Sequence, residues 1–219
     1  EAADDTGADV PVEVIDNGDG TYACAYTAAA EGRAALHVRV LGAPIAGSPF
    51  AVEVSPAVDS VLLTTAHAAQ LREWCPGGAP RLELLFRATR DGWATADFHR
   101  LCDNQGATVT VVRSTNGNVF GGFADAAWST TAGWQASAQA FLFLLVSHEG
   151  RAPARMAQSG SSPGNAMCCN ASYGPTFGGN HDLHISGNAN VNTNSYSNVG
   201  STYTLPAGAD ARTVLAGSH

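Results

Sequence analysis

The chain has 219 residues, of which 45% are hydrophobic and 14% are charged, a composition typical of a globular protein and unlike that of a disordered one. Its formal net charge is −8, and nine of the acidic side chains lie in residues 1–56, where only Arg33 and Arg39 oppose them. The sequence therefore lacks the basic footprint of a nucleic-acid-binding protein. The longest apolar run, Ala140–Val146, is too short for a membrane span, so we expect no membrane insertion.

The start of the chain and its cysteines indicate the cellular compartment. The first residues are acidic, without the basic and apolar regions of a signal peptide and without methionine, so we expect a processed chain or a piece of a longer protein. The cysteines are odd in number and show no Cys-x-x-Cys spacing: Cys24, Cys75, Cys102, Cys168 and Cys169. Free thiols in a reducing compartment are the simplest interpretation, which predicts an intracellular, cytoplasmic protein.

Residues 1–56 contain four short runs that alternate with period two: Val12–Val14, Tyr22–Tyr26, Leu36–Val40 and Phe50–Val54. Turn residues separate the runs, which indicates half-buried antiparallel strands. The link Asp16–Thr21, DNGDGT, predicts a hairpin because Asn, Asp and Gly tolerate the backbone angles of tight turns.

Two stretches within residues 1–56, DNGDGTYACAYTAAAEG and GSPFAVEV, resemble the filamin (ABP280) repeat, an immunoglobulin-like sandwich. The resemblance covers the later half of such a repeat, whose first three strands would precede residue 1. Four strands from two facing sheets cannot close a core, so we expect this segment to be completed by further sequence or by a neighbour. The resemblance implies a spacer, or a docking surface that takes a partner's strand onto a sheet edge.

The next segment begins with a compact hinge at Ser55–Ala57. A helix is predicted over Leu62–Trp74, capped by Thr64 or Thr65, with one face formed by Leu62, Ala66, Ala69 and Trp74. A buried strand is expected at Leu82–Phe86. A second helix is expected over Thr95–Cys102, with Thr95 as its N-cap.

The remaining elements are predicted to be strands and loops. The β-branched run Thr108–Val112 predicts a strand, and Thr115–Asn118 a tight hairpin. The continuously apolar run Ala140–Val146 predicts a central strand buried on both faces. Residues 150–166 are expected to form a mobile loop. The Phe-Gly-Gly pattern of residues 120–122 returns at residues 177–179, and we attribute both to backbones that approach closely.

Five blocks in the second segment look like the successive blocks of the TLDc domain: RDGWATADFHRLCD, TVTVVRSTNGNVFGGF, AFLFLLVS, GPTFGGNHDLHIS and SYSNVGSTY. The resemblance covers nearly all of residues 57–219 and implies a sandwich of two antiparallel sheets flanked by short helices. The family usually closes with a strand after a Leu-Ala-Gly-Ser-like segment, and here only His219 follows, so we expect that strand to be missing. The fold class is thus mainly β (α+β): a partial Ig-like repeat over residues 1–56, then a TLDc β-sandwich over 57–219.

Candidate catalytic groups can be considered one by one. His99 and Cys102 share a predicted helical face near Asp97 and Asp103, and could form a thiol–imidazole pair. The simpler interpretation is that neighbouring apolar residues pack inward while these side chains make local hydrogen bonds. The Cys168–Cys169 pair has no charged partner to lower a thiol pKa, so we expect a buried, unreactive pair.

Metal and phosphate sites are also not expected. His181 and His184, with Asp182 between them, could hold a metal, but strand alternation would send the two imidazoles to opposite faces. The polar run Asn188–Asn198 has too little negative charge for a tight calcium site. The Phe-Gly-Gly segments lack the Lys-Ser/Thr that follows a phosphate-binding loop.

The sequence therefore predicts no catalytic, cofactor-binding or metal residues and no enzyme. The TLDc resemblance implies proteins linked with resistance to oxidative stress and, in several cases, with binding the vacuolar proton pump (V-ATPase). We expect a scaffold in which a filamin-like spacer presents a TLDc domain to V-ATPase subunits or to cytoskeletal or axonemal proteins, the latter at a cilium. The alternative is an effector of oxidative-stress protection that acts through Cys102, Cys168 and Cys169.

Overall fold

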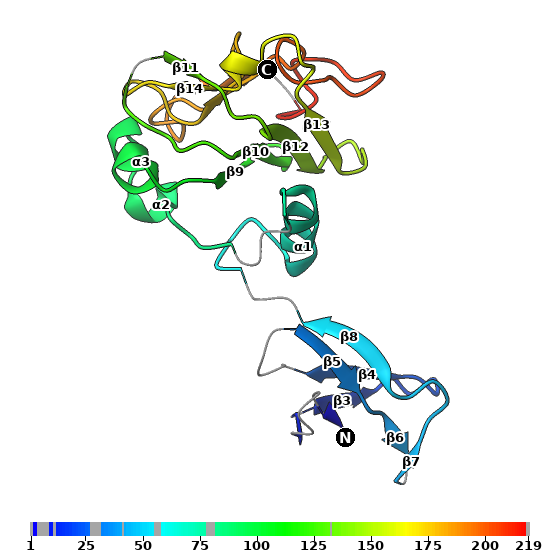
Figure 1. Ribbon diagram of the computed structural model, residues 1–219. Coiled ribbons are helices and arrows are strands. Elements are labelled where there is room, and N and C mark those ends of the chain that lie inside the picture. The colour runs from blue at the N-terminus through cyan, green and yellow to red at the C-terminus, as the bar shows by residue number, and fades with distance from the viewer. Residues whose placement is uncertain are drawn as a thin grey trace. The chain divides into compact units, whose positions relative to one another are not determined.

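The computed structural model describes residues 2–3, 9–10, 12–26, 32–40, 42–54, 58–77, 82–131 and 133–217. The chain divides into two compact units, Glu1–Ala57 and Val58–His219 (Figure 1). The expected hinge at Ser55–Ala57 and the end of the chain, residues 218–219, lie outside the described residues.

The described part of the first unit consists of two-stranded sheets, each of them antiparallel. The predicted hairpin is confirmed: β3 (Val12–Asp16) pairs with β4 (Tyr22–Tyr26) across the DNGDGT turn. The Asp16 and Asp19 carboxylates accept the backbone N–H groups of Gly18 and Thr21, at 2.8 and 2.9 Å, which fixes the turn. The other pairs are β1 (Ala2–Ala3) with β2 (Asp9–Val10), β5 (Gly32–Leu36) with β8 (Phe50–Val54), and β6 (Arg39–Val40) with β7 (Ala43–Pro44).

The second unit is built on two larger antiparallel sheets. The first has the order β13-β12-β10-β9 and is formed by β9 (Thr108–Arg113), β10 (Val119–Ala124), β12 (Phe141–Val146) and β13 (Ala154–Ala157). The second has the order β11-β14-β15-β16-β17 and is formed by β11 (Gly133–Gln135), β14 (Met167–Cys169), β15 (Thr176–Phe177), β16 (Leu183–His184) and β17 (Tyr196–Ser197). The fold is thus mainly β, as predicted.

The main core lies between these two sheets. Phe120, Leu142 and Leu144 from the first sheet and Met167 and Phe177 from the second belong to one buried cluster. A smaller cluster lies on the other face of the first sheet, where Leu71 and Cys75 pack against Phe123, Phe141 and Phe143. The strand β12 is therefore buried on both faces, as its continuously apolar sequence predicted.

Helices complete the unit. The helix α1 (Thr65–Trp74) supplies Leu71 to the smaller cluster and is capped by Thr64, whose hydroxyl accepts the His67 N–H at 3.2 Å. The short helix α2 (Ala88–Asp91) precedes α3 (Thr95–Cys102), and Pro163–Asn165 forms a 3₁₀ turn, η1. Among the described residues no helix has the length and apolar character needed to cross a membrane.

The two Phe-Gly-Gly segments meet inside the sandwich. A Cβ at Gly122 would lie 2.7 Å from the ring of Phe177, so the first motif receives the aromatic ring of the second. A Cβ at Gly121 would overlap the carbonyl oxygen of Thr110 on the adjacent strand β9. The predicted close approach of backbones is thus confirmed at Gly121, and at Gly122 the neighbour is a side chain.

Several local predictions are wrong. The helix α1 begins at Thr65, and its buried residues are Ala68 and Leu71, whereas Ala66 and Ala69 are exposed. Helix α3 starts at Thr95 with Ala94 as N-cap, and the Asp97 carboxylate accepts the Ala94 N–H at 3.2 Å.

Three further predictions fail in detail. Leu82–Phe86 belongs to no strand in the described part; Leu85 and Phe86 pack against the core instead, and a strand needs a ladder partner. Residues 150–166, expected to be a loop, contain β13 because Ala154–Ala157 pairs with β12 and buries Met156. Leu36–Val40 is divided between β5 and β6.

Candidate functional site: a histidine-rich and aromatic face around residues 170–173

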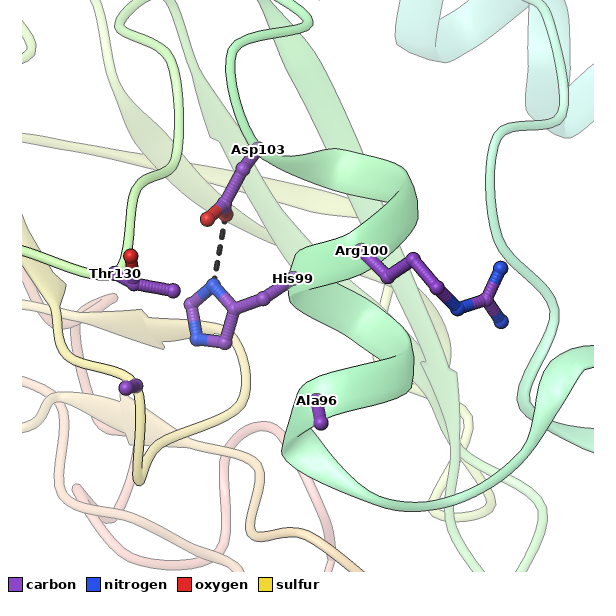
Figure 2. A pocket seen from close by; sticks show the side chains of 6 residues that line it. Ala96, His99, Arg100, Asp103 and Thr130 are labelled. Carbon is purple, nitrogen blue, oxygen red and sulfur yellow. Dashed lines mark hydrogen bonds and ion pairs between the residues drawn. The ribbon is translucent and has the colours of Figure 1, made fainter.

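Residues 170–173 connect β14 to β15, and a histidine from α3 binds their backbone. The Nε2 atom of His99 lies 3.0 Å from the carbonyl oxygens of both Asn170 and Tyr173. Its Nδ1 atom lies 2.7 Å from a carboxylate oxygen of Asp103, one helical turn further along the chain (Figure 2). His99 is buried, so these contacts replace the water that the imidazole would otherwise bind.

A shallow hollow of about 360 Å³ opens beside this histidine. Figure 2 shows His99 and Asp103 turned toward each other at one side of the helix, whereas Arg100 extends away from them. The lining residues are Ala96, His99, Arg100, Asp103, Thr130 and Ala171. Because both ring nitrogens of His99 already contact protein acceptors, the imidazole has no nitrogen left to bind a ligand or accept a proton from a substrate.

The side chain of Tyr173 packs on the other side into a cluster of rings, which we call the aromatic face. Its members are Trp134, Tyr173, His181, His184 and Tyr196. The Tyr173 ring contacts the His181 and His184 rings edge-on, at centroid distances of 5.3 and 5.1 Å. At its rim, Trp134 and Tyr196 are 43% and 48% exposed.

The two imidazoles of the aromatic face are stacked, with centroids 5.5 Å apart and an interplanar angle of 23°. The sequence analysis expected them on opposite faces of a strand, and this expectation is wrong. His181 lies before β16 in a turn, with φ of 55°, so strand alternation does not apply to it.

Hydrogen bonds determine which nitrogen of His184 carries hydrogen. The Thr176 hydroxyl donates to the Gly174 carbonyl at 3.0 Å, so its oxygen is left to accept from Nδ1 of His184 at 2.8 Å. Burial, and next the neighbouring His181, lower the pKa of His184 to about 4, and burial also lowers the pKa of His181. Both rings are therefore neutral at neutral pH.

The stacked arrangement does not form a metal site as it stands. In-plane lone pairs on stacked rings lie in nearly parallel planes and do not converge on one ion. The Asp182 carboxylate is occupied elsewhere, since it accepts the backbone N–H groups of Ser201, Thr202 and Tyr203 at 3.2, 2.8 and 2.7 Å. Within the described residues no group of three or more His, Cys, Asp or Glu side chains is placed to hold a metal ion.

The four cysteines with described side chains are free and buried. Burial, followed by the Asp103 and Asp91 charges, raises the pKa of Cys102 to about 12, and burial raises the pKa of Cys75 to about 11. Burial also raises the pKa of Cys168, and the Cys169 thiol donates to the Gln135 side-chain oxygen at 3.1 Å. Cys75, Cys102 and Cys168 therefore have little thiolate at neutral pH. The Cys24 side chain lies outside the described part.

In the Asn188–Asn198 segment, the side chain of Asn192 is fully engaged in hydrogen bonds within the loop. The Asn192 side-chain oxygen accepts from the Ser186 hydroxyl at 2.9 Å and from the Asn194 N–H at 3.0 Å, and its amide group donates to the Gly187 carbonyl at 2.8 Å. This amide oxygen is therefore engaged in closing the loop and is not directed at an ion.

Sequence reasoning named His99, His181 and His184 but missed Trp134, Tyr173 and Tyr196. The five rings of the aromatic face are spread over 63 positions, residues 134–196, on β11, β16, β17 and two connecting segments. No local spacing brings them together, because the order of strands in the second sheet does so.

Comparison with known proteins identifies two families. The model of the TLDc domain matches residues 57–217, and that of the filamin/ABP280 repeat matches residues 1–51. A similar protein is Filamin-C of Rattus norvegicus, which is 44% identical over 55 residues. That match covers 25% of this chain, and the chain spans 2% of the length of Filamin-C.

Proposed function

This chain belongs to the TLDc domain family, and we propose that it is a non-catalytic protein-interaction module in which a filamin-like segment presents the TLDc domain to a larger assembly. The observation that carries the proposal is the aromatic face, where Trp134 and Tyr196 are partly exposed on the second sheet. Tyrosine and tryptophan are enriched in the energetic centres of protein interfaces because they offer large, rigid contact areas.

The partner is an assembly of one of two kinds: the V-ATPase, which the TLDc resemblance favours, or a cytoskeletal or ciliary complex. The match of residues 1–51 to the filamin repeat supports the second kind. Both kinds place the protein in the cytoplasm. The aromatic face carries no formal charge at neutral pH, so binding through it depends on packing more than on ion pairs.

The test measures binding of the full chain to purified V-ATPase, to actin filaments and to microtubules. We expect saturable binding to one of them, weakened about tenfold or more when Trp134→Ala and Tyr196→Ala are combined. Trp93→Ala is a matched control, because Trp93 is also partly exposed but is not a member of the aromatic face. Failure to bind any of the three, or an equal loss with Trp93→Ala, would contradict the proposal.

The alternative function, protection from oxidative stress through reactive thiols, is disfavoured by the burial and raised pKa values of Cys75, Cys102 and Cys168. A chain carrying Cys24→Ser leaves only the four buried thiols. We expect them to react with a thiol reagent no faster than the domain unfolds. Rapid reaction of Cys102, Cys168 or Cys169 in the folded protein, together with peroxide protection lost on their replacement by Ser, would favour the alternative.

A further inference from the structure

The 170–173 segment lies between two sets of histidines with different hydrogen-bonding requirements. His99 contacts its backbone from α3, and the ring of Tyr173 is contacted by His184 of β16 and by His181 in the turn before β16. The segment's other hydrogen bonds to residues that the structure describes are local: Tyr173 N–H to the Asn170 carbonyl at 2.9 Å, and Ser172 N–H to the Asn170 side chain at 2.9 Å. Its attachment to the rest of the domain thus depends strongly on these imidazoles.

The contacts of His99 determine its protonation. Nδ1 faces a carboxylate oxygen of Asp103, and Nε2 faces two carbonyl oxygens, all of them acceptors. In either neutral tautomer one nitrogen would direct a lone pair at an acceptor 2.7–3.0 Å away. Only the doubly protonated imidazole donates to every neighbour, and Asp103 supplies the opposite charge.

His184, in contrast to His99, makes its contacts as a neutral ring with one hydrogen. One hydrogen, on Nδ1, satisfies Thr176, and a second would place a positive charge in a buried site beside His181. The other titratable groups around this ring are the phenols of Tyr173 and Tyr196, because the Asp182 carboxylate is directed at residues 201–203. No carboxylate therefore faces His184 from the described elements to stabilise a positive charge.

We propose that residues 170–173 form a pH-sensitive element, attached to the domain only while His99 carries two ring protons and His184 carries one. The charged groups near His99 are Asp103 and, on the same helix, Asp97 and Arg100; the hollow's other lining residues, Ala96, Thr130 and Ala171, are uncharged. Lowering the pH charges His184 and separates the stacked rings, which releases Tyr173. The inference concerns the order of this segment and does not depend on the proposed function.

The first measurement is nitrogen-15 NMR of the histidine rings in the full chain at neutral pH. We expect both ring nitrogens of His99 to be protonated, and His184 to show one protonated and one bare nitrogen. With Asp103→Asn, Nδ1 of His99 faces an amide that can donate, so the ring should become singly protonated. Asp97→Asn is the matched control on the same helix and should leave His99 doubly protonated. A neutral His99 in the wild type would overturn the proposal.

The second measurement follows the amide hydrogen exchange of residues 171–173 with pH, corrected for the intrinsic rate of exchange. We expect roughly tenfold or greater loss of protection toward pH 4, as His184 gains a second ring proton. His184→Phe should abolish this loss while retaining a ring against Tyr173. Protection that stays constant with pH in the folded wild type would overturn the proposal, whatever the stability of the variants.

Discussion

The two units of the chain bury similar strand sequences very differently. In residues 58–217, the apolar side chains of β10 and β12 are almost wholly inaccessible to solvent. In the described part of the first unit, adjacent residues on β3, Val14 and Ile15, are 59% and 54% exposed, and Tyr22 of β4, which pairs with Asp16, is 63% exposed. Adjacent residues point to opposite faces of a strand, so neither face of β3 is covered by the described residues.

The difference shows that a period-two pattern specifies strands and their pairing but not a core. A second sheet must supply the opposite surface, and in the larger unit it does so through Met167, Phe177 and Leu183. The sheets of the first unit that the structure describes are all two-stranded, and an isolated pair of strands is marginally stable in water. We therefore expect the free energy of unfolding to be determined mainly by the larger unit.

The largest expected effect is at the close approach between β9 and β10. Gly121→Val would force side-chain atoms into the Thr110 carbonyl and the Phe143 ring, so we expect a loss of about 4 kcal/mol or more, enough to prevent folding of the larger unit. Circular dichroism and denaturant unfolding measure the change. Gly164→Ala, where the new Cβ meets no atom within 4 Å, should leave stability within about 0.5 kcal/mol. Comparable losses at both positions would contradict this explanation.

The next effect is expected at Asp182, which binds three backbone N–H groups of residues 201–203 in the core. Asp182→Asn would turn an amide NH₂ toward these donors or leave some of them unpaired. We therefore expect the free energy of unfolding, measured with urea, to fall by about 3 kcal/mol. Glu149→Gln changes an exposed carboxylate that pairs with Arg151, and should cost less than about 1 kcal/mol. A loss at Asp182 no larger than that at Glu149 would mean that this carboxylate does not anchor the segment.

A smaller effect should depend on pH. The pKa of His184 is lowered from 6.5 to about 4 in the folded state, so the folded state disfavours the charged ring. Its contribution to stability is complete above pH 6.5 and is lost as the pH falls from 6.5 toward 4, by up to about 3 kcal/mol. Stability measured in this window should fall less steeply in His184→Phe than in the wild type. If the free energy of unfolding fell equally steeply with pH in the two proteins, His184 would not be the group responsible.

The smallest effect is expected in the first unit. Ile15→Ser and Tyr22→Ser replace exposed apolar side chains, so each should change the main unfolding transition by less than about 0.5 kcal/mol. Leu142→Ala, in the core of the larger unit, is the reference and should cost about 2–5 kcal/mol. Destabilisation of the main transition by Ile15→Ser to a similar degree would show that β3 is covered in solution and would remove the contrast between the units.

Much of the fold was determined by the sequence itself. Turn residues specified the DNGDGT hairpin, β-branched residues specified β9, and an uninterrupted apolar run specified β12 as a strand buried on both faces. The ordered sequence blocks identified the TLDc and filamin families, and the matches to residues 57–217 and 1–51 confirm both. These features depend on local backbone preferences and on the period of the pattern, which are encoded within a few neighbouring residues.

Tertiary structure alone decided the arrangement of the candidate site. Strand alternation gave the wrong prediction for His181 and His184, because a left-handed backbone at His181 precedes the strand and brings the two rings together. His99 makes the expected local hydrogen bond, through Nδ1 to Asp103, but its Nε2 atom also reaches carbonyl groups 71 and 74 positions away, which the sequence did not predict. Such contacts are determined by the order of strands in a sheet and by the packing of a helix beside a loop. Neither property has a period or spacing that can be recognised in one sequence.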